Sequence, residues 1–209
     1  MKKKSLIVNN YYQYEKQYWK DQKLVLGLDE AGRGCWAGPL VVAGCILPVN
    51  YQNNLIKDSK QLNEKQRFLL AKQIKKDALA YEIVCFSPKE VDQLNPKHAS
   101  ILSMEKITKK IKLKPDVVLI DAEKIKTDLP SISLIHGDSL SISIAAASIL
   151  AKTYRDQMMI DLDQQYPEYG FSKHKGYGTA LHSNVLNKKG PITNVHRFSY
   201  RPIKKLLVK

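Results

Sequence analysis

The chain has 209 residues, and its 34 Lys and Arg against 20 Asp and Glu give a formal net charge of +14. A chain of this length forms one ordinary domain with a buried core and leaves room for a small appendage. The three cysteines are odd in number and form no CxxC pair, which excludes a disulfide framework and a cysteine-based zinc site. The longest apolar runs, residues 39–47 and 142–151, are shorter than the roughly 18 residues of a membrane span. We expect a soluble protein of the reducing cytoplasm that has no membrane partner.

The positive charge is concentrated near the C-terminal end. Residues 169–209 contain nine Lys or Arg and no Asp or Glu. A general lysine bias of the genome is the alternative, but it does not account for the absence of acids from this segment. The pattern predicts a polyanion-binding lobe. We therefore divide the chain into an N-terminal extension (1–23), a central domain (24–168) and a basic C-terminal subdomain (169–209).

The N-terminal extension mixes aromatic side chains with lysines. Tyr11, Tyr14 and Tyr18 recur at the spacing of one helix face. This spacing predicts a helix that packs on the body of the protein. The alternative is that the aromatic rings stack on nucleic-acid bases.

Two apolar runs, residues 24–28 and 39–47, flank a glycine-rich bend and predict a β-hairpin. Asp29 and Glu30 enter this bend. Because side chains alternate between faces along a strand, the two carboxylates share one site only if the strand ends or bulges there. The glycines of the bend permit close approach of backbone N–H groups to a ligand, and Arg33 is a forked cation suited to phosphate. A hairpin turn with solvated acids is the alternative.

The following segment predicts a helix, a strand and two further helices. Asn63 is a candidate N-cap for a helix over residues 64–77, and residues 80–86 are typical of a strand. Helical patterns then cover residues 88–94 and 98–113. Alternating strands and helices indicate an α/β sheet.

Two more acids follow predicted strands. The apolar run 116–120 predicts a central strand that is buried on both faces, and Asp121 stands at its end. A second strand, 131–136, leads to Asp138 and a helix that extends through residue 165. A carboxylate at the end of a buried strand is costly unless it is paired or bound to metal. For Asp138, an N-cap role is the alternative.

Four acids thus stand at the ends of predicted strands: Asp29, Glu30, Asp121 and Asp138. Strand ends of an α/β sheet converge on a common site. Oxygen ligands without a His or Cys cluster select Mg²⁺ or Mn²⁺ over Zn²⁺. Clustered acids beside a basic lobe indicate cleavage of a phosphodiester.

The motifs resemble those of the ribonuclease HII family, from about residue 24 to residue 201. Five ordered segments carry the resemblance: 29–34 with 37–39, 58–60, Asp121, 137–138 with 144–148, 151–152 and 155–156, and 176–179 with His182. The resemblance implies an RNase H-like mixed β-sheet flanked by helices, with a small C-terminal helical subdomain. It also implies hydrolysis of the RNA strand of RNA–DNA hybrids and incision 5′ of single ribonucleotides embedded in duplex DNA.

The same resemblance assigns roles to individual residues. Asp29, Glu30, Asp121 and Asp138 become the catalytic, metal-binding carboxylates of a domain over residues 24–168. The turn residues Gly32, Arg33 and Gly34 would contact the ribose 2′-OH, and Tyr177 would stack on the neighbouring deoxyribose. Two Mg²⁺ or Mn²⁺ ions about 4 Å apart would support an in-line displacement that leaves 5′-phosphate and 3′-hydroxyl ends.

The chain departs from the family pattern at three places. It has Cys35–Trp36 where Pro–Leu is usual, Ala122 where Gly is usual, and Leu140 where a Lys is usual. We expect the first two to affect packing. The third removes a cation near Asp138, for which Lys60, Lys152 or Lys175 could compensate.

Other polar residues are weaker candidates. Ser59 and Lys60 are candidate phosphate contacts, with a turn that leads into the following helix as the alternative. His182 and His196 are expected to be capping or surface residues rather than catalysts.

Two rival functions use the same features. A junction resolvase would also cluster acids, but it does not need the Gly–Arg–Gly turn or Tyr177. A hybrid-binding module without catalysis would need only the basic lobe. We expect a monomer whose substrates are RNA–DNA hybrids and ribonucleotide-containing duplexes, and whose basic C-terminal tail is a candidate contact for a sliding clamp.

Overall fold

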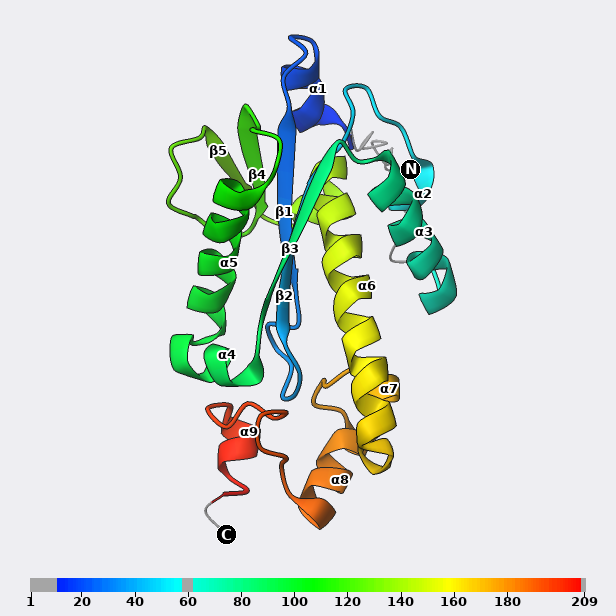
Figure 1. Ribbon diagram of the computed structural model, residues 1–209, viewed down its shortest axis with the longest axis vertical. Helices are drawn as coiled ribbons and strands as arrows, with labels where there is room; N and C mark the ends of the chain where they lie inside the picture. The colour runs from blue at the N-terminus through cyan, green and yellow to red at the C-terminus, as the bar shows by residue number, and fades with distance from the viewer. Residues whose placement is uncertain (1–10, 58–61, 208–209) are drawn as a thin grey trace, which may run out of the picture.

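The computed structural model describes residues 11–57 and 62–207, and a five-stranded mixed sheet lies at its centre (Figure 1). The strand order is β3-β2-β1-β4-β5. Strands β1 (Val25–Ala31), β2 (Leu40–Ile46) and β3 (Ala80–Phe86) are antiparallel neighbours. Strands β4 (Val117–Asp121) and β5 (Ser131–Leu134) run parallel to β1. The predicted α/β class with a mixed sheet is confirmed.

Helices cover both faces of the sheet. In Figure 1, α4 (Pro88–Leu94) and α5 (Pro96–Lys110) lie on one side, and α3 (Glu64–Asp77) and α6 (Ile142–Gln165) lie on the other. The short α2 (Asn54–Lys57) contacts α6. Beyond one end of the sheet lie α7 (Phe171–His174), α8 (Ala180–Lys189) and α9 (Arg201–Lys204). Two 3₁₀ turns, η2 (Gly137–Ser139) and η3 (Pro167–Tyr169), flank α6.

The alternation of side chains along the strands divides the core into two layers. Val25 of β1 belongs to the cluster packed under α6, whereas Leu26 and Leu28 belong to the cluster packed under α5. A Cβ at Gly27 would lie 2.1 Å from the backbone of Ser143 in α6, so α6 approaches β1 on the same face as Val25. Odd-numbered residues of β1 therefore face α6, and even-numbered residues face α5.

Capping residues mark where the helices begin, and some of these starts differ from the expected boundaries. Asn63 caps α3 in a reciprocal capping box with Gln66, as predicted. Helix α5 begins at Pro96, earlier than expected, because Asn95 caps it and proline is well tolerated in the first helical turn. Helix α6 begins at Ile142 with Ser141 as its N-cap, so the alternative N-cap role of Asp138 is wrong.

The N-terminal extension packs on the body through α1 (Gln13–Trp19), as the aromatic spacing predicts. Tyr11 and Trp19 are buried in the same cluster as the α6 side of the sheet. The carboxylate of Glu15 is buried and accepts hydrogen bonds from the Ser141 hydroxyl at 2.5 Å and the Ser143 N–H at 3.0 Å. An N-terminal helix thus holds the start of α6.

The last part of the chain has an apolar cluster of its own. It includes Tyr169, Phe171, Leu186, Val195 and Ile203. The cluster also takes in Ala37 from the hairpin and Met159 from α6, so it is continuous with the central domain. The division at residues 168 and 169 stays a prediction. Among the described helices, none combines the length and apolar character that crossing a membrane requires.

Candidate active site

Asp29 and Asp121 lie side by side at the ends of two parallel strands. The register pairs Leu28 with Ile120, which places Asp29 and Asp121 level on neighbouring strands. Both are odd-numbered members of strands whose odd residues face α6. Burial, with a smaller contribution from the nearby carboxylates of Glu30 and Asp121, raises the pKa of Asp29 to about 8, against a hydrogen bond with Ser148 of α6. Two acids 92 residues apart thus share one site.

Glu30 points to the other face of the sheet. Its Oε2 accepts a hydrogen bond from the Ser100 hydroxyl of α5 at 3.1 Å, and its Oε1 lies 3.2 Å from the Arg33 Nε. Burial raises the pKa of Glu30, and the Arg33 charge opposes that shift. The expectation that the strand ends or bulges before the two acids is wrong, because β1 continues in regular pairing to Ala31. The acids instead reach the end of the sheet from opposite faces, and both still lie near Asp121, whose charge raises the pKa of each.

Asp138 follows directly after a residue held by Asp121. The Gly137 N–H donates to Asp121 Oδ1 at 2.7 Å, and this bond fixes the start of η2. The Ser139 hydroxyl donates to Asp138 Oδ1 at 3.3 Å. Because Ser141 caps α6, Asp138 is not the N-cap of that helix. The structure therefore brings the loop of Asp138 to Asp121 through one backbone hydrogen bond.

The donor set suits a hard divalent cation, although within residues 11–57 and 62–207 no group of three or more His, Cys, Asp or Glu is already gathered around one point. Asp29 is a buried carboxylate whose pKa rises because its charge is desolvated and faces other carboxylates. A bound cation would stabilise the charged carboxylate and so offset both effects. Oxygen donors without thiolate or imidazole favour Mg²⁺ or Mn²⁺. The residues present fit such an ion.

Two buried arginines hold the glycine-rich turn between β1 and β2. The Arg155 guanidinium donates to the carbonyls of Pro39 at 2.9 Å, Lys175 at 2.8 Å and Ala37 at 3.0 Å. The Arg197 guanidinium donates to the Gly38 carbonyl at 2.9 and 3.1 Å and to the Arg33 carbonyl at 3.1 Å. Both arginines are fully buried. Neither arginine was predicted to have a function, because a single arginine forms no repeating pattern in the sequence that would reveal its role.

Gly32 and Gly34 serve different purposes. Gly32 has a φ of +94°, and a Cβ there would lie 2.1 Å from the Arg155 Nε, so the fold itself requires glycine. Gly34 has no such φ, and a Cβ there would meet no atom of the described residues within 4 Å, its two chain neighbours aside. The absence of a side chain at Gly34 therefore leaves backbone exposed toward solvent. This is the part of the turn that a ligand can approach.

Tyr177 lies next to two cations and remains accessible. Its residue is 41% exposed, and the Lys152 Nζ and the Arg155 guanidinium carbon each lie 5.7 Å from the ring centroid. The turn before it contacts the hairpin, since the Gly176 carbonyl accepts hydrogen bonds from the Trp36 N–H at 2.9 Å and the Ala37 N–H at 3.3 Å. An exposed ring is thus held at a fixed place beside the glycine-rich turn.

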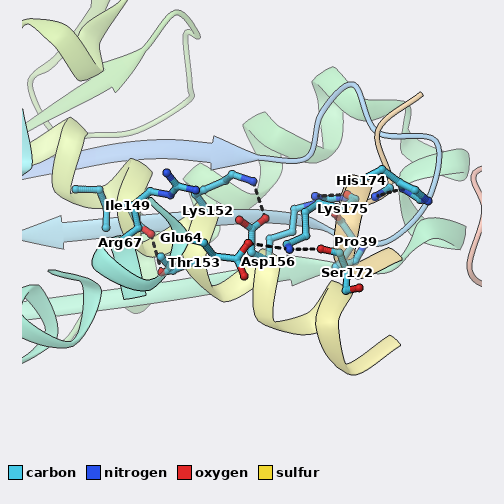
Figure 2. Close-up of polar contacts among 12 residues, drawn as sticks. Pro39, Glu64, Arg67, Ile149, Lys152, Thr153, Asp156, Ser172, His174 and Lys175 are labelled. Carbon is cyan, nitrogen blue, oxygen red and sulfur yellow. Dashed lines mark hydrogen bonds and ion pairs between the residues drawn. The ribbon is translucent and has the colours of Figure 1, made fainter. Parts of the chain in front are cut away.

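Lys152 and Lys175 are both engaged inside the protein (Figure 2). The Lys152 Nζ lies 2.6 Å from Asp156 Oδ1, four residues further along α6. The Lys175 Nζ lies 2.9 Å from Glu64 Oε2 and also donates to the Ser172 carbonyl, and only 8% of the residue is exposed. Lys152 stays within reach of the candidate site, whereas Lys175 joins α7 to α3. Ser59 and Lys60 lie outside the described residues.

The departures from the family pattern have local structural accounts. Cys35 is buried, and a Cβ at Gly178 would lie 2.2 Å from the Trp36 ring, so this pair is accommodated by packing. Ala122 has a φ of +54°, a conformation that costs a non-glycine residue roughly 1 kcal/mol. Leu140 is half-buried beside η2.

Three buried histidines support the turn that carries Tyr177. The His182 Nδ1 contacts the Tyr177 carbonyl at 3.0 Å, its Nε2 contacts the His196 Nε2 at 3.1 Å, and the His174 and His182 rings stack at 4.1 Å. The His196 Nδ1 accepts from the Ile192 N–H, which places the His196 proton on Nε2. His182 then accepts at Nε2 and donates from Nδ1. Of the two roles expected for His182 and His196, a cap or a surface residue, the surface role is wrong, because both are buried.

These histidines predict a loss of stability in mild acid. Burial, and then the neighbouring histidines, lower the pKa of His182 and His196 to about 4. The unfolded chain takes up protons near pH 6.5, so the free energy of unfolding is expected to fall as pH drops from about 6.5 to about 4. Urea titrations at several pH values give the slope of the unfolding free energy against pH. In His182→Asn this slope should correspond to about one fewer proton taken up on unfolding than in the parent protein. An unchanged slope would contradict the neutral network.

Among known protein families, one has a sequence model that covers most of this chain. The family model for ribonuclease HII matches residues 26–203 of this chain. The chain belongs to the ribonuclease HII family. It is 50% identical over 186 residues to a ribonuclease HII of Mycoplasma capricolum subsp. capricolum, covering 86% of this chain and 87% of that relative. A ribonuclease HII of Desulfitobacterium hafniense is 45% identical over 195 residues, 92% of this chain and 75% of that protein.

Solved structures show the same ribonuclease HII architecture. The ribonuclease H2 of Pyrococcus horikoshii OT3 superposes with a TM-score of 0.73 at 25% identity, covering 88% of this chain and 96% of that one. The RNase HII chain in a PCNA:RNase HII complex from Archaeoglobus fulgidus gives a TM-score of 0.74 at 27% identity, covering 85% and 95%. The predicted RNase H fold is confirmed. The protein is a metal-dependent ribonuclease H that cuts RNA–DNA hybrids internally.

Proposed function

We propose that this ribonuclease H also cuts 5′ of single ribonucleotides embedded in duplex DNA, with two divalent ions and with 5′-phosphate and 3′-hydroxyl products. The observation that carries the proposal is the pair Asp29 and Asp121, level on neighbouring strands, with an exposed glycine turn directly after β1. The acids would bind the ions that support cleavage. The turn provides a backbone surface that a ribose 2′-OH can approach.

Asp29, Glu30, Asp121 and Asp138 would hold Mg²⁺ or Mn²⁺. When bound, these ions would activate a water and stabilise the leaving 3′-oxygen. The chain itself positions these carboxylates. Ser100 and Ser148 orient two of the carboxylates from opposite faces of the sheet, and Gly137 ties Asp121 to the loop of Asp138.

Recognition of the junction between RNA and DNA falls to the turn and to Tyr177. Arg197 holds the Arg33 carbonyl from inside, and Arg155 holds the carbonyls of Ala37 and Pro39 in the same turn, so that the backbone of Gly32, Arg33 and Gly34 would offer its outer side to the 2′-OH. The exposed Tyr177 ring would stack on the deoxyribose that follows. Lys152, Ser59 and Lys60 would contact phosphates. The ammonium of Lys175, which was a candidate for the same task, is better explained as an internal tie to Glu64.

A methyl group at Gly34 is expected to weaken cleavage without weakening the fold. Gly34→Ala should raise KM or lower kcat/KM by about tenfold for a duplex with one ribonucleotide, because the added Cβ projects into the space reserved for the ribose. Its melting temperature should stay within about 2 °C of the parent protein, since none of the residues that the structure describes occupies that space. Equal kcat/KM for Gly34→Ala and the parent would exclude a close ribose contact at this residue.

The proposal is tested by mapping the cut in three labelled duplexes with Mg²⁺ or Mn²⁺. One duplex carries a single embedded ribonucleotide, one is an RNA–DNA hybrid, and one is an all-DNA four-way junction. The proposal expects incision 5′ of the lone ribose and no cut in the junction. Cleavage of the junction would favour a resolvase. Cleavage of the hybrid alone would limit the activity to long hybrids, and binding without a metal-dependent product would indicate a hybrid-binding module.

We also propose that the protein works as a cytoplasmic monomer whose basic C-terminal end contacts a sliding clamp. The clamp contact is supported by the PCNA:RNase HII complex of Archaeoglobus fulgidus, whose RNase HII chain has the same fold. The C-terminal segment 201–209 is rich in lysine, and its described part, residues 201–207, lies beyond the end of the sheet (Figure 1). Deletion of residues 201–209 should abolish co-elution with the clamp if this segment forms the contact.

A further inference from the structure

The Arg33 side chain lies between two carboxylates that come from different parts of the fold. Its Nη2 lies 2.7 Å from Glu123 Oε1, and its Nε lies 3.2 Å from Glu30 Oε1. These contacts differ in kind. The Nη2 contact with Glu123 is a hydrogen bond, whereas among the described residues the buried Nε has no hydrogen-bond partner. Arg33 is therefore held by Glu123 and only approached by Glu30.

Glu123 is placed to act as this holder. It follows β4 by two residues and is 8% exposed. Its backbone is fixed, because the Glu123 N–H donates to the Asp121 carbonyl at 2.7 Å and the Ser133 hydroxyl donates to the Glu123 carbonyl at 2.5 Å. Lys97 is its other cationic neighbour, at 3.8 Å and with a largely exposed side chain. Glu123 thus presents a rigid, buried carboxylate to Arg33.

The position of Arg33 bears on the availability of Glu30. Both oxygens of Glu30 have a neighbour, Ser100 at Oε2 and Arg33 at Oε1. A cation that binds Glu30 must displace the Arg33 guanidinium or bind beside it. If Arg33 retains an anionic partner of its own, its half-buried guanidinium stays paired after that displacement. Without Glu123, the guanidinium would have Glu30 as its nearest carboxylate and would compete with the cation.

We propose that Glu123 is a positioning residue that holds the Arg33 guanidinium in a hydrogen bond and so keeps Glu30 available to a divalent cation. This inference rests on the proposed metal-binding role of Glu30. It assigns to Glu123 a task distinct from ligating the ion, because Glu123 acts through Arg33. The turn that carries Glu123 begins at Asp121, so the same short segment supplies one candidate ligand and protects another.

The test is a double-mutant cycle on Mn²⁺ affinity, measured by the free-Mn²⁺ electron paramagnetic resonance signal with the full chain and no nucleic acid. The four proteins are the parent, Glu123→Gln, Arg33→Ala and the double variant. In the presence of Arg33, Glu123→Gln should weaken Mn²⁺ binding about fivefold, and in the Arg33→Ala background by less than about twofold. If Glu123→Gln weakens Mn²⁺ binding by the same factor with and without Arg33, or has no effect in either case, the inference is overturned. A simple loss of one negative charge near the ion would weaken binding whether or not Arg33 is present.

Two controls complete the design. Asp128→Asn removes an exposed acid from the same loop and should leave Mn²⁺ affinity unchanged. Asp29→Asn separates this inference from the proposed function. If Asp29→Asn abolishes binding while Glu123→Gln changes nothing, only the role of Glu123 is wrong. If Asp29→Asn has no effect on Mn²⁺ binding, the metal site and the inference are both wrong. Thermal unfolding of each variant shows that the comparison is between folded proteins.

Discussion

Asp29→Asn is expected to lower the rate of hybrid cleavage by at least about a thousandfold and to change hybrid affinity by less than about threefold. The substitution keeps the size of the side chain and removes its charge, so it removes a cation ligand without creating a cavity. Binding to the hybrid is expected to depend instead on exposed basic residues, which residues 169–209 supply without any Asp or Glu, although Lys175 and Arg197 of that segment are engaged inside the protein. Cleavage is measured in single turnover with excess enzyme, and affinity by fluorescence anisotropy.

The same variant should be more stable than the parent when no metal is present. The unfolded Asp29 ionises near pH 3.8, whereas burial raises the pKa of the folded residue to about 8. Between these values the unfolded state releases a proton that the folded state keeps, so this residue lowers the free energy of unfolding progressively from about pH 4 to about pH 8. Asparagine has no proton to lose. In a chelator, Asp29→Asn should therefore melt higher than the parent at pH 8, with a smaller difference at pH 5.

Asp161→Asn is the matched control for Asp29→Asn. Asp161 is an exposed acid of α6 that accepts a hydrogen bond from Gln157 at 2.8 Å. This variant should cleave and melt like the parent. Loss of hybrid binding together with cleavage in Asp29→Asn would show that the residue supports the fold of the binding surface, and the catalytic assignment would then be wrong.

Arg155→Met is expected to lower the free energy of unfolding by about 3 kcal/mol or more. Arg155 is fully buried and donates to three carbonyls, two from the β1–β2 turn and one from residue 175. Methionine fills much of the space but leaves these acceptors unpaired, and each buried unpaired acceptor costs about 1–3 kcal/mol. The loss should appear in urea-induced unfolding.

Arg155→Lys tests whether the charge or the planar fork matters. Lysine keeps a cation but has no guanidinium to reach several carbonyls in fixed directions, so it should recover part of the loss. A loss below about 1 kcal/mol for Arg155→Met would contradict the view that this side chain joins the two turns. Because Tyr177 follows the turn at Gly176, the methionine variant should also raise KM more than it lowers kcat.

The strands and most helices were predictable because their signals are local. The apolar run before Asp121 and the cap at Asn63 each need only a few residues to be read, and both predictions are confirmed. The end of β1 was not predictable in this way. Its pairing with β2 extends through Asp29 and Glu30, and that regular pairing sends the two acids to opposite faces. Cross-strand partners decide this, and they lie outside any local window.

The supporting residues of the site were missed for a related reason. Arg155 and Arg197 look like ordinary surface cations in the sequence, yet their partners lie between 116 and 164 residues away in the hairpin. Lys175 likewise became a substrate candidate because lysine suggests an exposed charge, while Glu64, 111 residues away, holds it inside. Charge composition predicts polyanion binding for the whole chain, but it does not show which cations are free to take part.

The most direct test of the whole account is to locate Mn²⁺ by anomalous scattering in crystals of the Asp29→Asn variant and of the parent protein, each with a non-cleavable duplex that carries one ribonucleotide. The account predicts two Mn²⁺ peaks in the parent, bound by Asp29, Glu30, Asp121 and Asp138 beside the scissile phosphate, and loss of at least one peak in the variant. Mn²⁺ bound away from Asp29 and Asp121, or a ribose remote from the turn at Gly34, would contradict it.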